Sequence, residues 1–511
     1  MNAPLSPHPR PDGAADTAGL DALAARVASD LDRIAHPRMP WLQPRPGPDG
    51  QPAFDVVVVG GGQSGLAIAF GLMRAQVRNI VVLDRAARGL EGPWLTYARM
   101  HTLRSPKDFT GPDLDVPSLT YQSWHEARFG EADWRALDLI PREHWADYLL
   151  WFRDVVGVPV RNEVEVLEIA PAGDLLAVAT LTGDGRRETL HARKVVLATG
   201  QEGAGRWTTL PALEGLPAHL RAHNADPIDF AALAGREVAV VGAGASAFDN
   251  AAAALEAGAA VHLLCRRAEI QLVQPYRWLT FAGFLRHVSE LDDVWRWRFM
   301  RAILAMREGF PQATYDRCAR HAGFALHEGA PILAARAVED GVELTIPQGT
   351  LRADFVISAT GIEMCFEARP ELASFARNIA TWGDRYAPPP DERDERLAAF
   401  PYLRDDYAFE EREPGLTPWI RNIHLFGIAS TMSFGPSGSS INAMTTAVPK
   451  LVSGVTRGLF TADLDRHWAS FKAYDVPQAV VRRTRAGEAT GSPGTGLANG
   501  TGAATVPDNR S

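Results

Sequence analysis

Cysteine is scarce in this sequence, with Cys265, Cys318 and Cys365 the only three in 511 residues. So few thiols exclude a disulfide scaffold, and without a Cys-x-x-Cys pair we expect no zinc cluster or dithiol redox motif. No segment carries the roughly 18 apolar residues that a membrane span needs. The first 13 residues also lack the apolar core of a secretory signal. We therefore expect a cytoplasmic protein with no membrane span and no metal site.

Long basic runs are missing as well. Lys and Arg number 52 against 61 Asp and Glu, so the formal net charge is 52 − 61 = −9. This balance disfavours a nucleic-acid partner. The hydrophobic share of 46% and the charged share of 22% are those of a globular chain. Because 511 residues exceed what one hydrophobic core usually supports, we expect two domains.

Short β-branched runs, of the kind buried in parallel sheets, recur along the chain. They lie at residues 54–59, 195–198, 238–241 and 355–358, and Ala-rich helical stretches such as residues 251–257 alternate with them. This alternation predicts an α/β fold built from βαβ units. Ahead of them, apolar spacing from Thr17 predicts one amphipathic helix, followed by a Pro/Gly-rich linker up to residue 52.

The first glycine fingerprint, Gly60-Gly61-Gly62-Gln63-Ser64-Gly65, follows a predicted strand and opens a predicted helix. In a G-x-G-x-x-G turn the glycines allow a tight turn, close approach of a pyrophosphate and close packing of helix on strand. The pyrophosphate then lies on the helix N-terminus, with Gln63 and Ser64 at the turn. Asp84 ends the next predicted strand, where a carboxylate can bind ribose hydroxyls.

The second fingerprint, Gly242-Ala243-Gly244-Ala245-Ser246-Ala247, has the same context. In the position matching Asp84 it carries Arg266 and Arg267, which suit a ribose 2′-phosphate rather than ribose hydroxyls. The two sites therefore predict FAD in the first and NADPH in the second, with hydride transfer between the cofactors.

With both fingerprints in place, the chain resembles the class B flavin-dependent monooxygenases over roughly residues 54–455. This family includes flavin-containing monooxygenases, Baeyer–Villiger monooxygenases and N-hydroxylases. Two Ala-Thr-Gly turns, at residues 198–200 and 359–361, match the points where the family's chain crosses between its FAD and NADPH domains. The resemblance thus gives Gly361 a place at the cofactors, and Gly92-Pro93-Trp94 resembles the family segment that sets a tryptophan, here Trp94, beside the flavin.

The same resemblance implies catalytic residues. Leu103-Arg104-Ser105-Pro106-Lys107 is similar to a family stretch on the reactive side of the flavin, although Arg104 stands where flavin-containing monooxygenases have asparagine. The family's identifying motif is degraded. Counting back from Gly242 puts its histidine at His223, and a competing register gives Gly215 and His219. Ser437 lies in a Gly/Ser turn, residues 435–442, that resembles the segment facing the flavin pyrimidine ring.

The domain order implied is an NADPH domain inserted in an FAD domain. We expect a tail, helix and linker over 1–53, FAD-domain parts over 54–215 and 359–486, an NADPH domain with an aromatic-rich helical insertion over 216–358, and a disordered tail over 487–511. The expected activity inserts one oxygen atom of O2 into a small organic substrate through a flavin C4a-(hydro)peroxide. The alternatives are an NAD(P)H-dependent reductase or oxidase with an external acceptor, and a non-catalytic flavin- or NADPH-binding protein. A homodimer is compatible with each.

Overall fold

The structure is a computed structural model that describes residues 17–34, 37–306, 308–436 and 440–481. By contacts the chain divides into two units, Met1–Ala462 and Asp463–Ser511. The second unit contains α16 (Leu464–Ala473), on which Trp468 and Phe471 stack. The expected disordered tail, and Ser437, lie outside the described residues. Among the helices within them, none is long and apolar enough to cross a membrane.

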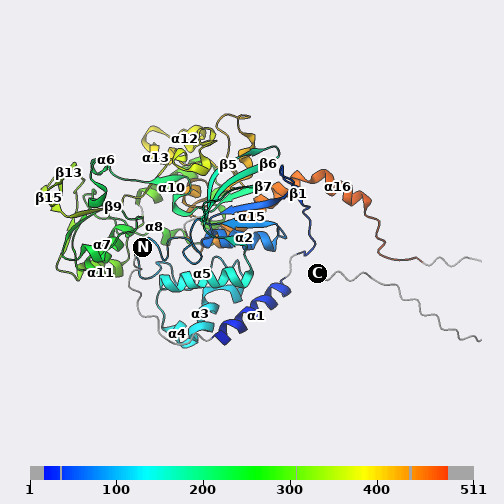
Figure 1. The fold of residues 1–511 in the computed structure, drawn as a ribbon, viewed down its shortest axis with the longest axis horizontal. Helices are drawn as coiled ribbons and strands as arrows, with labels where there is room; N and C mark the ends of the chain where they lie inside the picture. Colours follow the sequence, from blue (N-terminus) through cyan, green and yellow to red (C-terminus); the bar gives the residue numbers. More distant parts are fainter. Residues whose placement is uncertain (1–16, 35–36, 307, 437–439, 482–511) are drawn as a thin grey trace, which may run out of the picture. The chain divides into compact units, whose positions relative to one another are not determined.

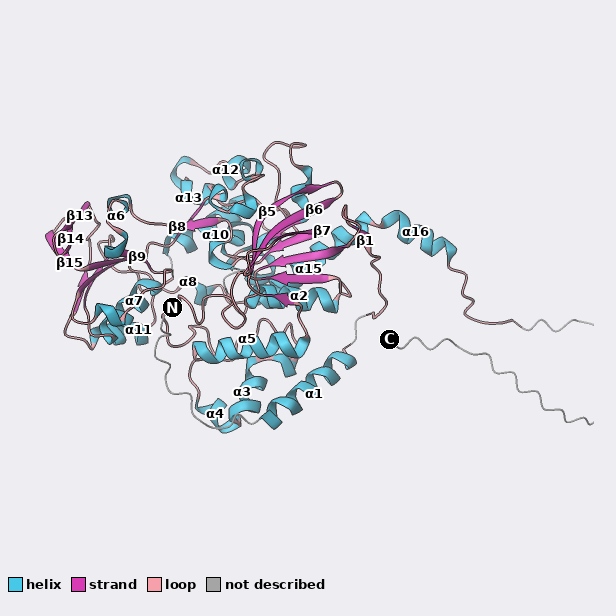
Figure 2. Ribbon diagram, viewed as in Figure 1, coloured by secondary structure: helices cyan, strands magenta, loops and turns pink. Residues whose placement is uncertain are grey.

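The first sheet of the larger unit has eight strands (Figures 1 and 2). Its parallel part runs in the order β4, β3, β2, β7, β18. The strands are β1 (Arg45–Pro46), β2 (Pro52–Val59), β3 (Ile80–Leu83), β4 (Val160–Arg161), β5 (Val164–Ala172), β6 (Leu175–Thr182), β7 (Arg187–Leu197) and β18 (Ile423–Leu425). Since β5, β6 and β7 form an antiparallel meander, β7 belongs to both parts.

The second sheet is wholly parallel, in the order β12, β11, β10, β16, β9. The strands are β9 (Arg221–His223), β10 (Glu237–Val241), β11 (Ala260–Leu264), β12 (Phe324–His327) and β16 (Phe355–Ser358). A separate antiparallel sheet, β13 (Ala334–Val338), β14 (Gly341–Ile346) and β15 (Gly349–Ala353), packs on one face through apolar side chains. Helix α7 (Ala245–Glu256) covers the other face. Figure 1 shows α7, α11 and β13 together at this end of the unit.

The two halves are structural repeats of one another. Each places the strand of its fingerprint third in a five-stranded parallel order, and each carries a three-stranded antiparallel segment. In the first half this segment ends in β7, which is itself the fourth strand of the order, whereas in the second half the separate segment β13, β14 and β15 precedes the fourth strand, β16. In both, a helix links the fingerprint strand to the next strand. This helix is α2 (Gln63–Arg74) in the first half and α7 in the second. These are the βαβ units that the sequence predicts.

The second half is inserted in the first. The chain leaves the first sheet after β7 and returns after β16, and the two crossings pair as an antiparallel ribbon of β8 (Gly205–Trp207) and β17 (Ile362–Met364). The Thr208 N–H donates to the carbonyl of Gly361 at 2.9 Å, which ties the entry to the exit of the inserted half.

Besides α2 and α7, the described α-helices of the larger unit are α1 (Thr17–Arg33), α3 (Tyr121–Phe129), α4 (Glu131–Ala136), α5 (Arg142–Val156), α6 (Pro211–Glu214), α8 (Pro275–Trp278), α9 (Ala282–His287), α10 (Asp293–Met306), α11 (Gln312–Ala319), α12 (Trp382–Arg385), α13 (Glu395–Ala398), α14 (Thr431–Phe434) and α15 (Met444–Ala462). Figure 2 shows α2 and α15 beside the first sheet. The aromatic-rich stretch forms α8 to α11 between β11 and β12. Some of its rings, such as Trp297, are buried, whereas Trp278 and Trp295 are exposed.

Candidate functional site

The glycines of the first fingerprint have two different reasons to be glycine. Gly60 has φ +105°, and a Cβ there would lie 2.3 Å from the carbonyl oxygen of Ala198. A Cβ on Gly65 would lie 1.8 Å from the Gly60 carbonyl oxygen. Gly60 is therefore required by its positive φ and its contact with the Ala198 segment, and Gly65 by the packing of α2 on the turn.

Gly62 has no such constraint from the residues that the structure describes. It caps α2 with φ −72°, and the nearest atom to a Cβ there is the Gly92 Cα at 3.8 Å. The open space lies at the N-terminus of a helix, where free N–H groups and the helix dipole favour an anion. This arrangement fits the pyrophosphate of a dinucleotide.

Asp84 is held beside this turn. Its carboxylate accepts hydrogen bonds from the N–H groups of Gly61 at 2.6 Å and Ala86 at 2.7 Å. Burial raises the pKa of Asp84, although these two hydrogen bonds act in the opposite direction. The carboxylate is therefore fixed at the end of β3, the place from which it can accept hydrogen bonds from a ribose.

A cavity adjoins Gly61 and Gly62, and Trp94 forms part of its wall. The Nε1–H of Trp94 is buried without a hydrogen-bond partner among the described residues, so a bound cofactor could supply the acceptor. Two further wall residues were missed from the sequence: Glu91 and Arg153 form a largely buried ion pair at 2.9 Å. Glu91 directly precedes the Gly92-Pro93-Trp94 segment, and this position was the only feature of the sequence that could have identified it as a wall residue.

The second fingerprint repeats this division of roles. Gly242 has φ +138°, and a Cβ there would lie 2.5 Å from the Ala359 carbonyl oxygen, whereas a Cβ on Gly244 meets no atom of a described residue within 4 Å. Gly244 caps α7, and Ser246 is exposed in its first turn. In both halves, the first glycine of the fingerprint packs on the alanine of an Ala-Thr-Gly turn, so each of these turns lies directly against a glycine fingerprint. Gly361 completes the second turn with φ +86°.

The two arginines after β11 differ in their surroundings. Arg267 donates from Nη2 to the carbonyl of Ala305 in α10 at 2.7 Å. Arg266 is exposed, and no described residue forms a hydrogen bond or ion pair with its guanidinium. Arg266 therefore has the freer guanidinium for a 2′-phosphate.

Arg104 joins the two halves of the unit. Its Nη2 donates to Asp249 of α7 at 2.6 Å, and its Nη1 lies 3.5 Å from Glu308. Asp249 is only 3% exposed and also accepts from Thr314 at 3.4 Å. Ser105, the next residue, is half-buried. Sequence reasoning missed Asp249 as the partner of Arg104. Asp249 lies in the second turn of α7, 145 positions after Arg104, and no sequence motif links the two residues.

His223 ends β9, opposite Ser358 of β16, at the carboxyl edge of the second sheet. Ligands of open parallel sheets bind at this edge. Burial lowers the pKa of His223. Its Nδ1 accepts from the Ala225 N–H at 3.2 Å, so the neutral ring carries its proton on Nε2, which is buried without a partner among the described residues. Within those residues, no hydrogen bond or ion pair joins His223 to Arg104.

The turn around Ser437 is described only at its flanks. On the N-terminal side, a Cβ on Gly435 would lie 2.9 Å from the side chain of Val288, so the helical insertion covers this flank. On the other side, a Cβ on Gly111 would lie 2.5 Å from the Ile441 carbonyl oxygen, and α15 then begins at Met444.

Comparison with known proteins places this geometry in a family. Residues 57–280 match the pyridine nucleotide-disulphide oxidoreductase family. The chain is 40% identical over 465 residues to the FAD-dependent urate hydroxylase of Xanthomonas campestris pv. campestris, covering 90% of this chain and 97% of that protein.

Solved structures share the fold at lower identity. The ornithine hydroxylase of Pseudomonas aeruginosa superposes with a TM-score of 0.63 at 16% identity, covering 80% of this chain and all of that one. The L-lysine 6-monooxygenase of Pseudomonas syringae gives 0.60 at 20% identity, covering 79% and 99%. Together with the two fingerprints and the inserted domain, these likenesses lead to one assignment: the chain belongs to the class B flavin-dependent monooxygenases, a family of FAD- and NADPH-dependent oxidoreductases.

Proposed function

We propose that this chain hydroxylates urate. The observation that carries the proposal is the 40% identity to a FAD-dependent urate hydroxylase over nearly the whole of that protein. In this reaction urate, O2, NADPH and a proton give hydroxylated urate, NADP⁺ and water. Two of the four electrons that reduce O2 come from NADPH and two from urate.

FAD would be held in the first half by Gly60, Gly62, Gly65, Asp84 and Trp94, with its pyrophosphate at the N-terminus of α2. When bound, FAD supplies hydride acceptance and O2 activation. The open space at Gly62, the fixed carboxylate of Asp84 and the buried unpartnered N–H of Trp94 support this assignment.

NADPH would be held in the second half by Gly242, Gly244 and Ser246, with Arg266 on the 2′-phosphate. Arg267 would assist more weakly, because α10 already accepts a hydrogen bond from it.

Arg104, Ser105 and His223 are the proposed catalytic residues. A guanidinium stays protonated at physiological pH, so Arg104 can hold and stabilise negative charge but cannot move a proton. Asp249 would fix Arg104 in place. His223 is the residue that can donate a proton or hydrogen bond, from Nε2. Ser105 would add a hydroxyl beside Arg104.

The test is NADPH oxidation by the purified, yellow protein with and without urate. We expect urate to stimulate oxidation, with one NADPH and one O2 consumed per urate and little hydrogen peroxide released. Oxidation that yields only peroxide would indicate the oxidase alternative, and no NADPH oxidation would indicate the non-catalytic one. The homodimer and the cytoplasmic location stay predictions, for light scattering and cell fractionation to test.

A further inference from the structure

A series of side-chain contacts connects the first half of the larger unit to His223 of the second. It begins at Glu202, in the short 3₁₀ helix η2 (Gly200–Glu202) that continues from the first Ala-Thr-Gly turn. It passes through Trp207 of β8, the strand by which the chain enters the inserted half, and it ends at His223 of β9. The three residues lie on three different elements, so their contacts couple the two halves.

The carboxylate of Glu202 is held at both of its oxygens. Oε2 accepts a hydrogen bond from Arg369 at 2.9 Å and lies 3.4 Å from Arg85, which directly follows Asp84. Oε1 accepts from the Nε1–H of Trp207 at 2.7 Å. Burial alone would raise the pKa of Glu202, but the hydrogen bond from Trp207 and the two guanidinium charges bring it below its ordinary value. A fixed negative charge therefore faces the indole.

The indole of Trp207 is the surface on which the His223 ring packs. The two ring centroids lie 5.0 Å apart, with the planes at 37°. Tyr97, from the loop of the first half that follows Trp94, contacts the same indole edge-on with centroids 5.8 Å apart. Because Nε1–H is bonded to Glu202, the indole is fixed in one orientation between these neighbours.

The other contacts of His223 hold its backbone and one edge of its ring. Its N–H donates to Asp226 at 2.7 Å, and its Nδ1 accepts from the Ala225 N–H at 3.2 Å. Nε2, on the opposite edge, has no hydrogen-bond partner among the described residues. The contact with Trp207 therefore restrains the remaining tilt of the ring, and with it the direction of the Nε2–H.

From these contacts we propose that Glu202 is a positioning residue for His223, acting through the indole of Trp207. The inference rests on the proposed function, in which His223 donates a proton or a hydrogen bond from Nε2. Glu202 acts on His223 in two ways, because it fixes the ring on which His223 packs and it places a negative charge nearby.

The charge has an effect of its own. Burial lowers the pKa of His223, whereas the negative charges of Asp226 and Glu202 act in the opposite direction. A cation faces the same turn, since Arg99 donates to the carbonyl of Asp226 at 3.3 Å, and Ser358 of the neighbouring strand β16 is uncharged. Removing the charge of Glu202 should therefore lower the pKa of His223 further.

The test compares Glu202→Gln and Trp207→Phe with the wild-type holoenzyme. Glutamine keeps an acceptor for the indole but removes the charge, whereas phenylalanine keeps a ring against His223 but removes the hydrogen bond. The titration of His223 is followed by NMR without substrate, and its signal is assigned by its loss in His223→Gln. The pH profile of urate-stimulated NADPH oxidation is measured on the same proteins.

The two variants should differ in what they change. In Glu202→Gln, the pKa of His223 should fall, and the limb of the pH profile that reports His223 should move to lower pH with it. In Trp207→Phe, the pKa should change less, but kcat should fall about tenfold at every pH because the donor is no longer held in one direction.

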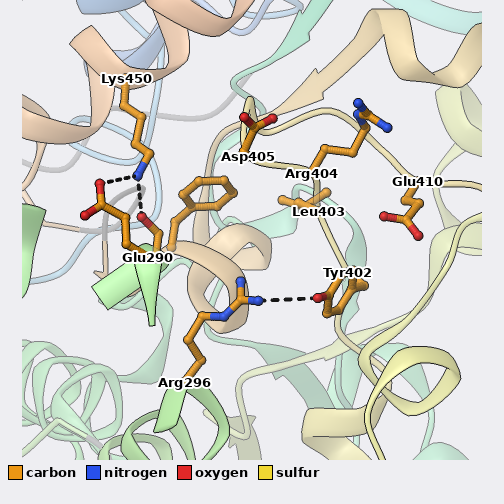
Figure 3. A pocket seen from close by; sticks show the side chains of 10 residues that line it. Glu290, Arg296, Tyr402, Leu403, Arg404, Asp405, Glu410 and Lys450 are labelled. Atoms are coloured by element: carbon orange, nitrogen blue, oxygen red, sulfur yellow. Dashed lines mark hydrogen bonds and ion pairs between the residues drawn. The ribbon is translucent and has the colours of Figure 1, made fainter. Parts of the chain in front are cut away.

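Glu410→Gln is the matched control. Glu410 is likewise half-buried and paired with an arginine, Arg385 at 2.7 Å, but it lines a separate cavity of about 590 Å³ where the helical insertion meets the C-terminal part of the chain (Figure 3). This variant should leave the pKa of His223 and the pH profile unchanged.

An unchanged His223 titration in Glu202→Gln, or an equal change in Glu410→Gln, would overturn the role of Glu202 whether or not urate is turned over. Wild-type kcat in Trp207→Phe would overturn it as well. A His223 titration that responds to Glu202→Gln, in a protein whose NADPH oxidation urate does not stimulate, would support the action of Glu202 on His223 and refute the proposed function.

Discussion

Replacing Gly62 with alanine should weaken FAD binding and leave the folded protein intact, whereas the same replacement at Gly65 should destabilise the fold. The two glycines stand three positions apart in one turn. Across the described part of the chain, a Cβ on Gly62 meets no atom closer than 3.8 Å, but a Cβ on Gly65 lies 1.8 Å from a backbone oxygen. The two substitutions therefore distinguish a glycine required for FAD binding, Gly62, from a glycine required for the packing of the protein, Gly65.

The magnitudes follow from these distances. Gly62 has φ −72°, which alanine adopts without strain, so the free energy of unfolding of the FAD-free protein should change by less than about 1 kcal/mol. FAD affinity should fall by about 1.5–3 kcal/mol, because the pyrophosphate can no longer reach the N–H groups of α2. For Gly65→Ala, the overpacking should cost about 1–3 kcal/mol or more of stability.

Urea unfolding of the FAD-free proteins and fluorescence titration with FAD measure both quantities. If Gly62→Ala binds FAD like the wild type, the pyrophosphate does not approach this glycine. If both variants lose stability equally, the open space at Gly62 is not the reason for its glycine.

Three further perturbations test other parts of the structure. Arg266→Ala should raise the KM for NADPH about tenfold or more with little effect on the KM for NADH. Arg267→Ala should raise the KM for NADPH less, because Arg267 also donates a hydrogen bond to α10. Steady-state kinetics with both nucleotides measure these effects, and a larger effect of Arg267→Ala would contradict the assignment of Arg266 to the 2′-phosphate. Asp249→Asn removes the negative charge that holds Arg104. It should lower the free energy of unfolding by about 1–3 kcal/mol and increase the hydrogen peroxide released per NADPH oxidised. An unchanged peroxide yield would show that Asp249 does not position Arg104 for the reaction. Burial lowers the pKa of Lys194 to about 8. Between about pH 8 and the usual lysine pKa near 10.5, the unfolded state binds the extra proton, so stability should rise with pH in that window by about 1.4 kcal/mol per unit at most. Lys194→Met should remove this rise in pH-dependent urea unfolding, and an identical slope in the variant would contradict the buried, neutral lysine.

The fold was predictable because its signals are local. Each fingerprint combines a β-branched run, a glycine turn and a helical stretch within about 30 residues, and such a unit has one common solution in an α/β protein. The Ala-Thr-Gly turns could be located through their resemblance to the family. The equivalence of the antiparallel segments β5–β7 and β13–β15 could not be predicted, because an alternation of apolar and polar residues in a strand includes no residue that identifies the segment.

The site was predictable only where glycine or charge marks a cofactor. Arg104 was identified as a candidate, but its partner Asp249 depends on how two domains pack, which no sequence spacing records. The ion pair of Glu91 and Arg153 in the wall of the cavity beside Gly62 depends on tertiary packing in the same way.

The pairing of β8 with β17, the two connections between the halves, has a consequence for how the chain folds during synthesis. The first sheet cannot be completed until β18 is synthesised, long after β7 has left the ribosome, so its closure spans the whole inserted domain. The inserted domain can fold earlier as a unit, and its hydrogen-bonded entry and exit then hold the two ends of the interrupted domain together. Its folding thus replaces a long flexible loop by a short one and lowers the entropic cost of bringing β18 to β7.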